Sequence, residues 1–328
     1  MSLLKLCAFA DESSPTVAGQ VEALQRNHIQ LLEVRNVDGV NISKLTPNEA
    51  KALKNTLDKN GLAVWSLGSP LGKIDLTDDF APHLELFKQS LETARILNAK
   101  CIRLFSFFTK DYSSAALDEV CRRLNLFLEA AEGSGVLVCH ENEKGIYGDV
   151  AARCLQLHRA LPKLKAVFDP ANFVQCGQDS KEAWQLLEPY VYYFHLKDAL
   201  PNGQVVPAGC GAGNLPWLIR QYRSKANASG VMTLEPHLKI FGGLAGLEQQ
   251  GEQSKIDDFA YPTNEAAFDA AVTAVKKNYK RFRLLKTGGF YEQPKYCRYW
   301  HWKHGAFSRQ SNLRKAGYRA AAYRRLRQ

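Results

Sequence analysis

The chain has 328 residues, of which 45% are hydrophobic, so it can bury a large core. No apolar run approaches the roughly 20 residues that a bilayer-spanning helix needs, and residues 1–10 lack the basic leader of a signal peptide. The eight cysteines form no CxxC pair and most lie in apolar contexts, which predicts reduced thiols in a cytoplasmic protein. We therefore expect neither a membrane protein nor a disulfide-stabilised scaffold.

The net charge of +10 is concentrated near one end of the sequence. Residues 287–328 hold ten of the 43 Lys and Arg residues and a single acid, Glu292. Residues 1–286 are left with 33 basic and 32 acidic residues, a net charge of +1. Because this body is nearly neutral, its charge gives no reason to expect a nucleic-acid partner.

Residues 3 to about 280 repeat a unit of strand followed by helix. The predicted strands are Leu3–Phe9, Gln30–Arg35, Ala63–Leu67, Cys101–Phe105, Val136–His140, Ala166–Asp169, Tyr192–Leu196 and Val231–Glu235. Amphipathic stretches between them predict helices at Thr16–Asn27, Pro47–Asn60, Phe80–Leu97 and Tyr112–Glu132. Eight such units predict an α/β protein with a single (β/α)8 TIM barrel domain over residues 1–286. A doubly wound open sheet is the alternative, but Phe9–Pro15 lacks the glycine-rich turn which that fold carries after its first strand.

Local signals mark some helix boundaries and three long loops. Thr46 and Pro47 open a helix with a cap and a first-turn proline, and Asp149 is expected to cap the helix over residues 150–161. The connections over residues 66–79, 200–214 and 237–262 follow the third, seventh and eighth strands. They are candidate lids or substrate walls, with plain surface insertions as the alternative.

Residues 287–328, the basic tail, contain nine aromatic residues and no helical period before about Asn312. Three interpretations of the tail remain open. It is an arm that binds nucleic acid through phosphate contacts and stacking, or an ordered extension packed on the barrel or on a neighbouring subunit. The third interpretation, which the abrupt change of composition favours, is a non-native or disordered ending from a shifted reading frame.

Four predicted strands end in side chains that can bind a metal ion, namely Glu141, Asp169, His195 and Glu235. In a barrel the carboxyl ends of the strands meet at one mouth. Three carboxylates gathered there raise one another's pKa, and a divalent cation relieves their repulsion. For any one residue a salt bridge or a loop cap is the alternative, but the set of four predicts one divalent metal ion, with Mn²⁺, Mg²⁺, Co²⁺ or Zn²⁺ as candidates.

The fragments around these residues resemble the xylose isomerase-like TIM barrels, and within them the sugar phosphate isomerase/epimerase group. They are His140–Asn142, Val167–Asn172, Phe194–Asp198 and Thr233–His237. The resemblance covers residues 3 to about 280 and leaves the tail unmatched. It implies a barrel fold, and a metal held by a Glu, an Asp, a His and a second Glu from successive strands, here Glu141, Asp169, His195 and Glu235.

The implied activity is the isomerisation or epimerisation of a small sugar or sugar phosphate. Proton abstraction alpha to a carbonyl creates an enediolate, which a chelating metal stabilises as its charge develops. In epimerases of this kind the two glutamates move protons on opposite faces of the substrate, so the resemblance gives Glu141 and Glu235 these catalytic roles.

Four further residues are predicted to bind the substrate: Lys197, Arg35, His237 and Asn172. By alternation Lys197 shares the face of His195, and Arg35 shares that of Glu33, although structural ion pairs would explain these residues as well. Asn172 departs from epimerase relatives, which often carry a His at this position. His140 should point away from the mouth.

Three other functions are alternatives to the isomerase. A dehydratase of an inosose or dehydroshikimate-like compound would form the same enolate but expel a hydroxyl group. A repair enzyme of the endonuclease IV type shares this barrel but needs extra histidines for a multi-metal cluster. A non-enzymatic protein would bind nucleic acid through its tail. The resemblance favours a small-molecule carbohydrate substrate, and a homo-oligomer, because relatives commonly form dimers or tetramers.

Overall fold

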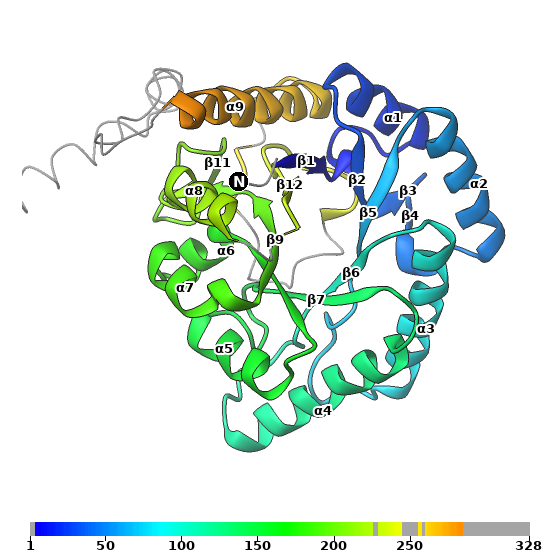
Figure 1. Ribbon diagram of the computed structural model, residues 1–328, viewed down its shortest axis with the longest axis vertical. Helices are drawn as coiled ribbons and strands as arrows, with labels where there is room; N and C mark the ends of the chain where they lie inside the picture. The colour runs from blue at the N-terminus through cyan, green and yellow to red at the C-terminus, as the bar shows by residue number, and fades with distance from the viewer. Residues whose placement is uncertain (1–3, 226–228, 245–254, 258–259, 285–328) are drawn as a thin grey trace, which may run out of the picture. The chain divides into compact units, whose positions relative to one another are not determined.

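The computed structural model describes residues 4–225, 229–244, 255–257 and 260–284. Eight parallel strands close into a barrel, in the order β1-β12-β9-β8-β7-β6-β5-β2 (Figure 1). They are β1 (Lys5–Ala8), β2 (Leu31–Val34), β5 (Ala63–Gly68), β6 (Cys101–Leu104), β7 (Leu137–Glu141), β8 (Lys165–Phe168), β9 (Val191–Leu196) and β12 (Val231–Leu234). The last strand pairs with the first through Lys5↔Val231 to Ala8↔Leu234. This closure confirms the predicted TIM barrel and excludes the open sheet.

Helices surround the barrel (Figure 1). They are α1 (Val17–Arg26), α2 (Pro47–Lys59), α3 (Ala81–Ile96), α4 (Ser114–Ala131), α5 (Ala151–Ala160), α6 (Pro170–Gln175), α7 (Ser180–Leu187), α8 (Leu215–Ser224) and α9 (Asn264–Leu284). Short 3-10 turns occur at Ala10–Glu12, Ile42–Lys44 and Glu188–Tyr190. Among the described residues no helix is long and apolar enough to cross a membrane.

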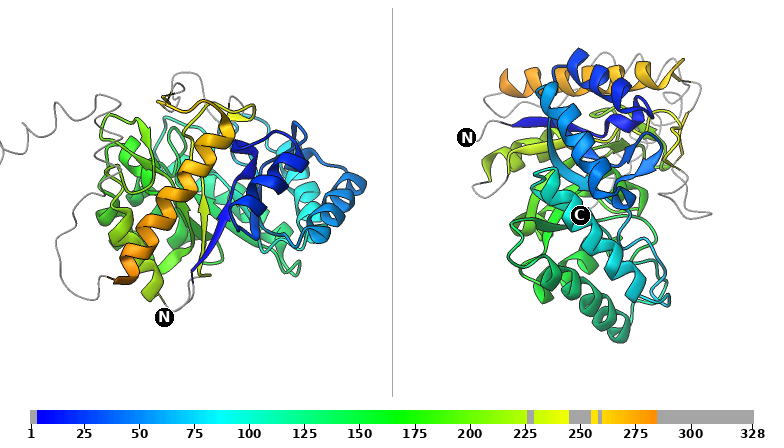
Figure 2. Two further views of the ribbon diagram at one scale, coloured as in Figure 1. Left: turned by 90° about the horizontal axis from the view of Figure 1, so that it is seen from above. Right: turned by 90° about the vertical axis from the view of Figure 1, so that its right-hand side faces the viewer.

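Helix α9 lies beside α1 (Figure 2) and completes the ring of helices around the barrel (Figure 1). Asp269 of α9 pairs with Arg26 at 3.0 Å. Lys276 donates to the backbone oxygen of Asn27 at 2.6 Å, just after α1 ends. The barrel unit extends from residue 1 to Leu284, and the predictions made for the tail over residues 287–328 lie outside the described part of the chain.

Helix starts follow the local sequence at α2 but not at α5. Thr46 and Glu49 form a capping box, with Thr46 N donating to Glu49 Oε2 at 2.8 Å, as the threonine–proline pair predicts. The prediction that Asp149 caps α5 is wrong, because the cap position is Val150. Asp149 instead pairs with Arg153 one turn on. The free N–H of Ala151 donates to the side chain of Gln178 at 2.8 Å.

Side chains that point into the barrel at the amino ends of its strands form an apolar layer that we call the floor. Its buried members are Cys7, Trp65, Cys101, Cys139, Val167, Tyr193 and Val231. Burial raises the pKa of the Cys7 and Cys139 thiols well above the usual value, so they stay protonated. Cys7, Cys101, Cys121, Cys139 and Cys154 are free thiols, in agreement with the prediction. Cys297 lies outside the described residues.

The loop over residues 200–214 is organised by one buried carboxylate, Asp198. Its oxygens accept hydrogen bonds from the backbone of Gly209, Gly211 and Gly213, each at 2.9 Å, and of Ala199 at 3.0 Å. A Cβ atom on Gly211 would lie 2.3 Å from Asp198 Oδ1, so the close approach requires glycine. The glycine spacing therefore serves the packing of this loop.

In the part of the chain that the structure describes, the loop after β9 contacts the loop after β12 at Lys255. Residues 198–199 (β10) and 205–206 (β11) form a small hairpin, and Gln204 makes a parallel bridge with Lys255. Val205 N donates to the backbone oxygen of Lys255 at 2.9 Å. Most of the remaining loop after β12, residues 245–254, lies outside the described residues. The lid or wall roles of these loops stay predictions.

Candidate metal centre

The four strand-end residues meet at the carboxyl ends of the strands, which we call the mouth of the barrel. Glu141 ends β7, Asp169 follows β8, His195 lies near the end of β9 and Glu235 follows β12. All four are buried, and one ligand atom from each lies within 4.8 Å of the others. Each comes two or four residues after a floor residue on the same strand, and side chains two apart share one face of a strand.

Asp169 is fixed by hydrogen bonds between the ends of β7 and β8. Its Oδ1 accepts from the backbone N–H of Asn172 at 3.0 Å, and its own N–H donates to Asn142 Oδ1 at 3.0 Å. The amide of Asn172 donates to the backbone oxygen of Asn142 at 2.8 Å. Asn172 therefore braces the loop that carries Asp169. Its Oδ1 atom is buried and accepts no hydrogen bond in the described part of the chain.

Lys197 lies among the candidate ligands rather than beyond them. Its Nζ is 2.9 Å from Asp169 Oδ2 and 3.0 Å from Glu235 Oε2. Burial alone would lower the pKa of this ammonium, but the two carboxylates outweigh burial and raise the pKa well above its usual value. The prediction that Lys197 shares the face of His195 is confirmed.

The carboxylates at the mouth differ in their preferred charge. Burial raises the pKa of Asp169 to about 7, although the nearby Lys197 lowers it. Burial would also raise the pKa of Glu235, but Lys197, His237 and His195 together hold it well below the usual range. The site therefore favours an added proton or cation at Asp169, and a bare carboxylate at Glu235.

Arg35 lies on the β1 side of the mouth and joins three acids. Its guanidinium makes two hydrogen bonds to Asp11, at 2.9 and 3.0 Å, and one to Glu12 at 3.2 Å. A fourth contact reaches Glu235 Oε1 at 3.3 Å. The guanidinium lies 4.4 Å from the ring centroid of Phe9 and 4.5 Å from that of Phe241. Burial lowers the pKa of Arg35, but the nearby carboxylates of Asp11 and Glu12 outweigh burial and raise it above its usual value. The guanidinium therefore stays charged.

His237 extends this group toward the loop after β12. Its backbone N–H donates to Glu12 Oε2 at 2.7 Å, and its Nε2 lies 3.5 Å from Glu12 Oε1 and 3.6 Å from Glu235 Oε1. Both ring nitrogens are buried without a hydrogen bond to any described residue. The residue adopts a left-handed backbone conformation, with φ of 45°.

The other side of the mouth carries Arg103 and Glu33. Arg103 Nε lies 3.1 Å from Glu141 Oε2 and 3.9 Å from Glu33 Oε1. His195 stands between two carboxylates, with Nδ1 at 2.9 Å from Glu141 Oε1 and Nε2 at 3.3 Å from Glu33 Oε2. Tyr193 donates its hydroxyl hydrogen to Glu33 Oε1 at 2.8 Å.

The predicted site lacks three residues that the structure places at the mouth or in contact with it, namely Asp11, Glu12 and Tyr193. The acidic pair follows the first strand directly, so its place at a strand end was a usable signal. Tyr193 reads as an apolar strand residue, and its contact with Glu33 depends on barrel closure. His140 points away from the mouth, as predicted, and its Nε2 lies 3.0 Å from Ser106 Oγ.

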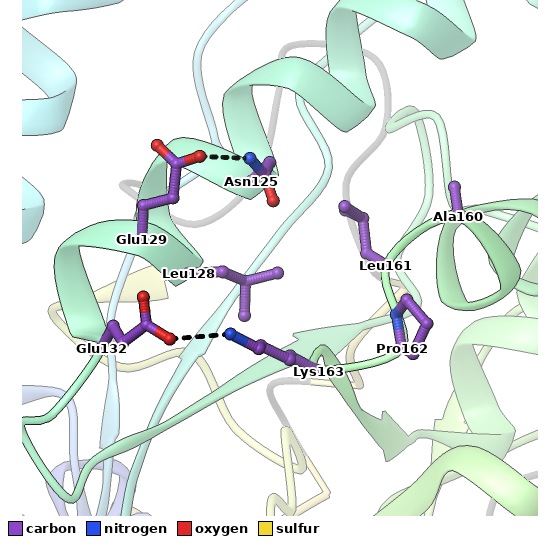
Figure 3. A pocket seen from close by; sticks show the side chains of 8 residues that line it. All are labelled: Asn125, Leu128, Glu129, Glu132, Ala160, Leu161, Pro162 and Lys163. Atoms are coloured by element: carbon purple, nitrogen blue, oxygen red, sulfur yellow. Dashed lines mark hydrogen bonds and ion pairs between the residues drawn. The ribbon is translucent and has the colours of Figure 1, made fainter.

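The mouth is separate from a shallow hollow at the other end of the barrel. This hollow lies between the end of α4 and the connection from α5 to β8 (Figure 3), and is lined by residues such as Leu128 and Pro162. Its one ion pair, Lys163 with Glu132 at 2.9 Å, is mostly exposed. Nothing in its lining resembles the buried, charged group at the mouth.

The donors at the mouth suit a divalent metal ion. Three carboxylates and one imidazole are the oxygen-rich set that such ions bind in proteins. Asp169 Oδ2 is buried and, among the described residues, accepts no hydrogen bond of good geometry. The fold and this group together define an α/β barrel with a buried group of three carboxylates and one histidine at its mouth.

Residues 23–253, more than half of the chain, match the model of the xylose isomerase-like TIM barrel family. The chain therefore belongs to the xylose isomerase-like TIM barrel family. No curated protein matches it in sequence.

Solved structures with a similar fold include several enzymes. D-psicose 3-epimerase with D-tagatose from Clostridium cellulolyticum H10 has a TM-score of 0.64 and 14% identity, over 84% of this chain and 99% of that one. The IolI protein with a binding zinc atom has a TM-score of 0.65 and 14% identity, over 85% and 99%. The probable 3-DHS dehydratase AsbF from Bacillus anthracis has a TM-score of 0.63 and 17% identity, over 84% and 99%. At these identities the similarity establishes the fold alone.

Proposed function

We propose that this protein is a metal-dependent isomerase or epimerase of a small sugar or sugar phosphate. The observation that carries the proposal is the group of four buried donors, Glu141, Asp169, His195 and Glu235, within 4.8 Å of one another at the mouth. Membership of the family supports it. So do the titles of similar structures, which name a sugar 3-epimerase and a zinc-binding protein.

The same four residues would hold the metal ion. Asp169 Oδ2 and the Nδ1 face of His195 point into the group, and both glutamates offer it an oxygen. When bound, a divalent cation supplies Lewis-acid polarisation of a substrate carbonyl. The buried surroundings strengthen that effect, because little water screens it.

Glu141 and Glu235 are the proposed proton carriers. They flank the mouth on either side of β8 and β9, since the barrel order is β12-β9-β8-β7. Glu235 is held ionised by Lys197 and its neighbours, which is the form that accepts a proton. One glutamate removes the hydrogen from the carbon next to the carbonyl, and the other returns a hydrogen to the opposite face. Arg103, 3.1 Å from Glu141, balances the charge on that side.

Lys197, His237 and Arg35 surround the position where a polyhydroxylated substrate would sit. An ammonium donates three hydrogen bonds, so in the described part of the chain Lys197 keeps one after its contacts with Asp169 and Glu235. The buried ring nitrogens of His237, which bond to no described residue, suit a substrate hydroxyl group. Arg35 acts mainly by holding Glu235 and the acidic pair in place.

Incubation of the full-length protein with a panel of ketoses, ketose phosphates and inososes in D₂O, with Mn²⁺ or Co²⁺ added, tests the proposal. We expect one sugar to return as an epimer or isomer that carries deuterium next to its carbonyl. Loss of water with a new ultraviolet chromophore would replace the isomerase by a dehydratase on the same site. The absence of both exchange and dehydration across the panel would contradict the proposal.

A further inference from the structure

Glu33 is a further buried carboxylate at the mouth, and the group of four donors does not include it. It lies on β2, three strands from β9 through the ring order β9-β12-β1-β2, and its side chain is fully buried. Its Oε2 lies 3.3 Å from Nε2 of His195. A buried carboxylate loses its hydration, so it needs partners that compensate this loss.

The partners of Glu33 fix its orientation. Oε1 accepts the hydroxyl hydrogen of Tyr193 at 2.8 Å, and that hydroxyl lies 3.3 Å from Ser66 Oγ. Arg103 lies 3.9 Å away on the other side. Because the Tyr193 hydroxyl group on the floor holds Oε1, the other oxygen, Oε2, faces the imidazole of His195. The carboxylate is therefore aimed at one particular nitrogen.

The imidazole of His195 is fixed as well. Phe9 and Tyr193 contact it edge to face, with ring centroids at 5.4 and 5.5 Å. Its Nδ1 faces the ligand group, at 2.9 Å from Glu141 Oε1 and 3.5 Å from Glu235 Oε2. A metal-binding imidazole nitrogen must offer a lone pair, so the hydrogen has to stay on the other nitrogen. Glu33 is the acceptor placed to receive it.

We propose that Glu33 is a positioning residue that keeps the hydrogen of His195 on Nε2 and so selects Nδ1 as the metal-binding atom. The inference rests on the proposed function in one respect, namely that a metal ion binds at the mouth. Carboxylates that orient a ligating histidine in this way raise its basicity, and their loss weakens metal binding roughly 10- to 100-fold. Tyr193 supports the same arrangement indirectly, because its hydroxyl group donates to Glu33 and not to His195.

Titration of Co²⁺ into the metal-stripped full-length protein tests this assignment through its visible absorption band. We expect Glu33→Leu to weaken Co²⁺ binding roughly 10- to 100-fold. Glu33→Gln should weaken it less, because its amide oxygen still accepts the hydrogen, and Tyr193→Phe should weaken it least. Glu132→Gln, an exposed carboxylate at the other end of the barrel, should leave the affinity unchanged.

Unchanged Co²⁺ affinity in Glu33→Gln and Tyr193→Phe would overturn the assignment even if the leucine variant does not fold. A second measurement follows the ring nitrogens of His195 in the Zn²⁺-loaded protein by ¹⁵N NMR, with His195→Asn to assign the signals. Hydrogen on Nε2 supports the assignment, and zinc on Nε2 overturns it.

The outcomes separate this inference from the proposed function. If the wild-type protein binds Co²⁺ and the Glu33 variants bind it equally well, only the inference fails. If the variants weaken binding as expected but no sugar exchanges hydrogen with solvent, only the proposed function fails. A wild-type protein that binds no divalent metal at all would overturn both.

Discussion

The mouth and the floor of the barrel are built from the same strands, a few residues apart, yet they bury opposite kinds of side chain. On β7 Cys139 belongs to the floor and Glu141 to the mouth, and on β9 the same holds for Tyr193 and His195. The floor gains free energy by removing apolar surface from water. The mouth carries buried charges, which cost free energy unless each one meets a partner.

This difference separates stability from chemistry along each strand. The floor needs volume and shape. Conservative exchanges there should change the free energy of unfolding without affecting the metal site, except at Tyr193, whose hydroxyl group donates to Glu33. The mouth depends on particular charged atoms. Its carboxylates form ion pairs at fixed distances with Arg35, Arg103 and Lys197. Floor substitutions other than at Tyr193 should therefore change stability alone, whereas mouth substitutions should also change activity.

The largest expected effect belongs to the mouth. Glu141→Gln and Glu235→Gln each remove a proposed proton carrier, so we expect the rate of deuterium incorporation into the substrate to fall roughly 10²- to 10⁴-fold. The melting temperature should fall, because Arg103 loses a buried carboxylate partner in the first variant and Lys197 loses one in the second. Glu132→Gln at the exposed end of the barrel serves as the control for the same chemical change. A full exchange rate in both mouth variants would end the assignment of these roles.

The next effect belongs to the floor. Trp65 stacks on Tyr192, with ring centroids at 5.7 Å, and meets Tyr193 edge on at 5.9 Å. Trp65→Ala leaves a cavity and should lower the free energy of unfolding by about 3–5 kcal/mol, as measured by chemical denaturation. Trp65→Phe, which keeps a ring, should cost less. Co²⁺ affinity should be the same in both folded variants, and a large loss of affinity would show that floor and mouth are coupled.

Asp198 sharpens the comparison, because it lies at the mouth yet has a structural role. Asp198→Asn keeps one acceptor oxygen but sets an NH₂ group against the backbone N–H groups of Gly209, Gly211 and Gly213. We expect a loss of about 1–3 kcal/mol in the free energy of unfolding. Metal affinity should change little. Gly211→Ala, which crowds the same carboxylate, should destabilise in parallel, and a stable Asn variant would argue against this role.

The sequence predicts that the four donors lie close together, but it does not predict which residues surround them. Strand ends are local features, since an apolar run stops at a charged residue, and parallel strands bring such ends together. The hydrogen bond from Tyr193 to Glu33 joins residues 160 positions apart, and that from His237 to Glu12 spans 225 positions. These contacts depend on how the barrel closes, which no local pattern encodes.

One local prediction fails for an identifiable reason. Asp149 lies one residue before the true cap of α5, where its carboxylate reaches Arg153 instead of the helix N–H groups.

The smallest expected effect lies on the outer surface, away from both regions. Hydrogen bonds from Arg122 and Arg123 lower the pKa of Glu119 on α4 to about 2, from a usual value of 4.5. Because the folded-state pKa is depressed, the stabilisation is present above pH 4.5 and is lost as the pH falls toward 2. Glu119→Gln should cost about 1 kcal/mol or less at pH 7, since solvent screens the pair. The difference from wild type should vanish near pH 2, and a difference that persists there would contradict the ion-pair origin.

The claim that the mouth holds a metal ion is tested most directly by the metal content of the purified full-length protein. We expect about one divalent ion per chain by mass spectrometry of the metals, and its loss in Glu141→Gln and Asp169→Asn. A wild-type protein that carries no divalent metal, and binds none when Mn²⁺, Mg²⁺, Co²⁺ or Zn²⁺ is offered, would contradict the claim.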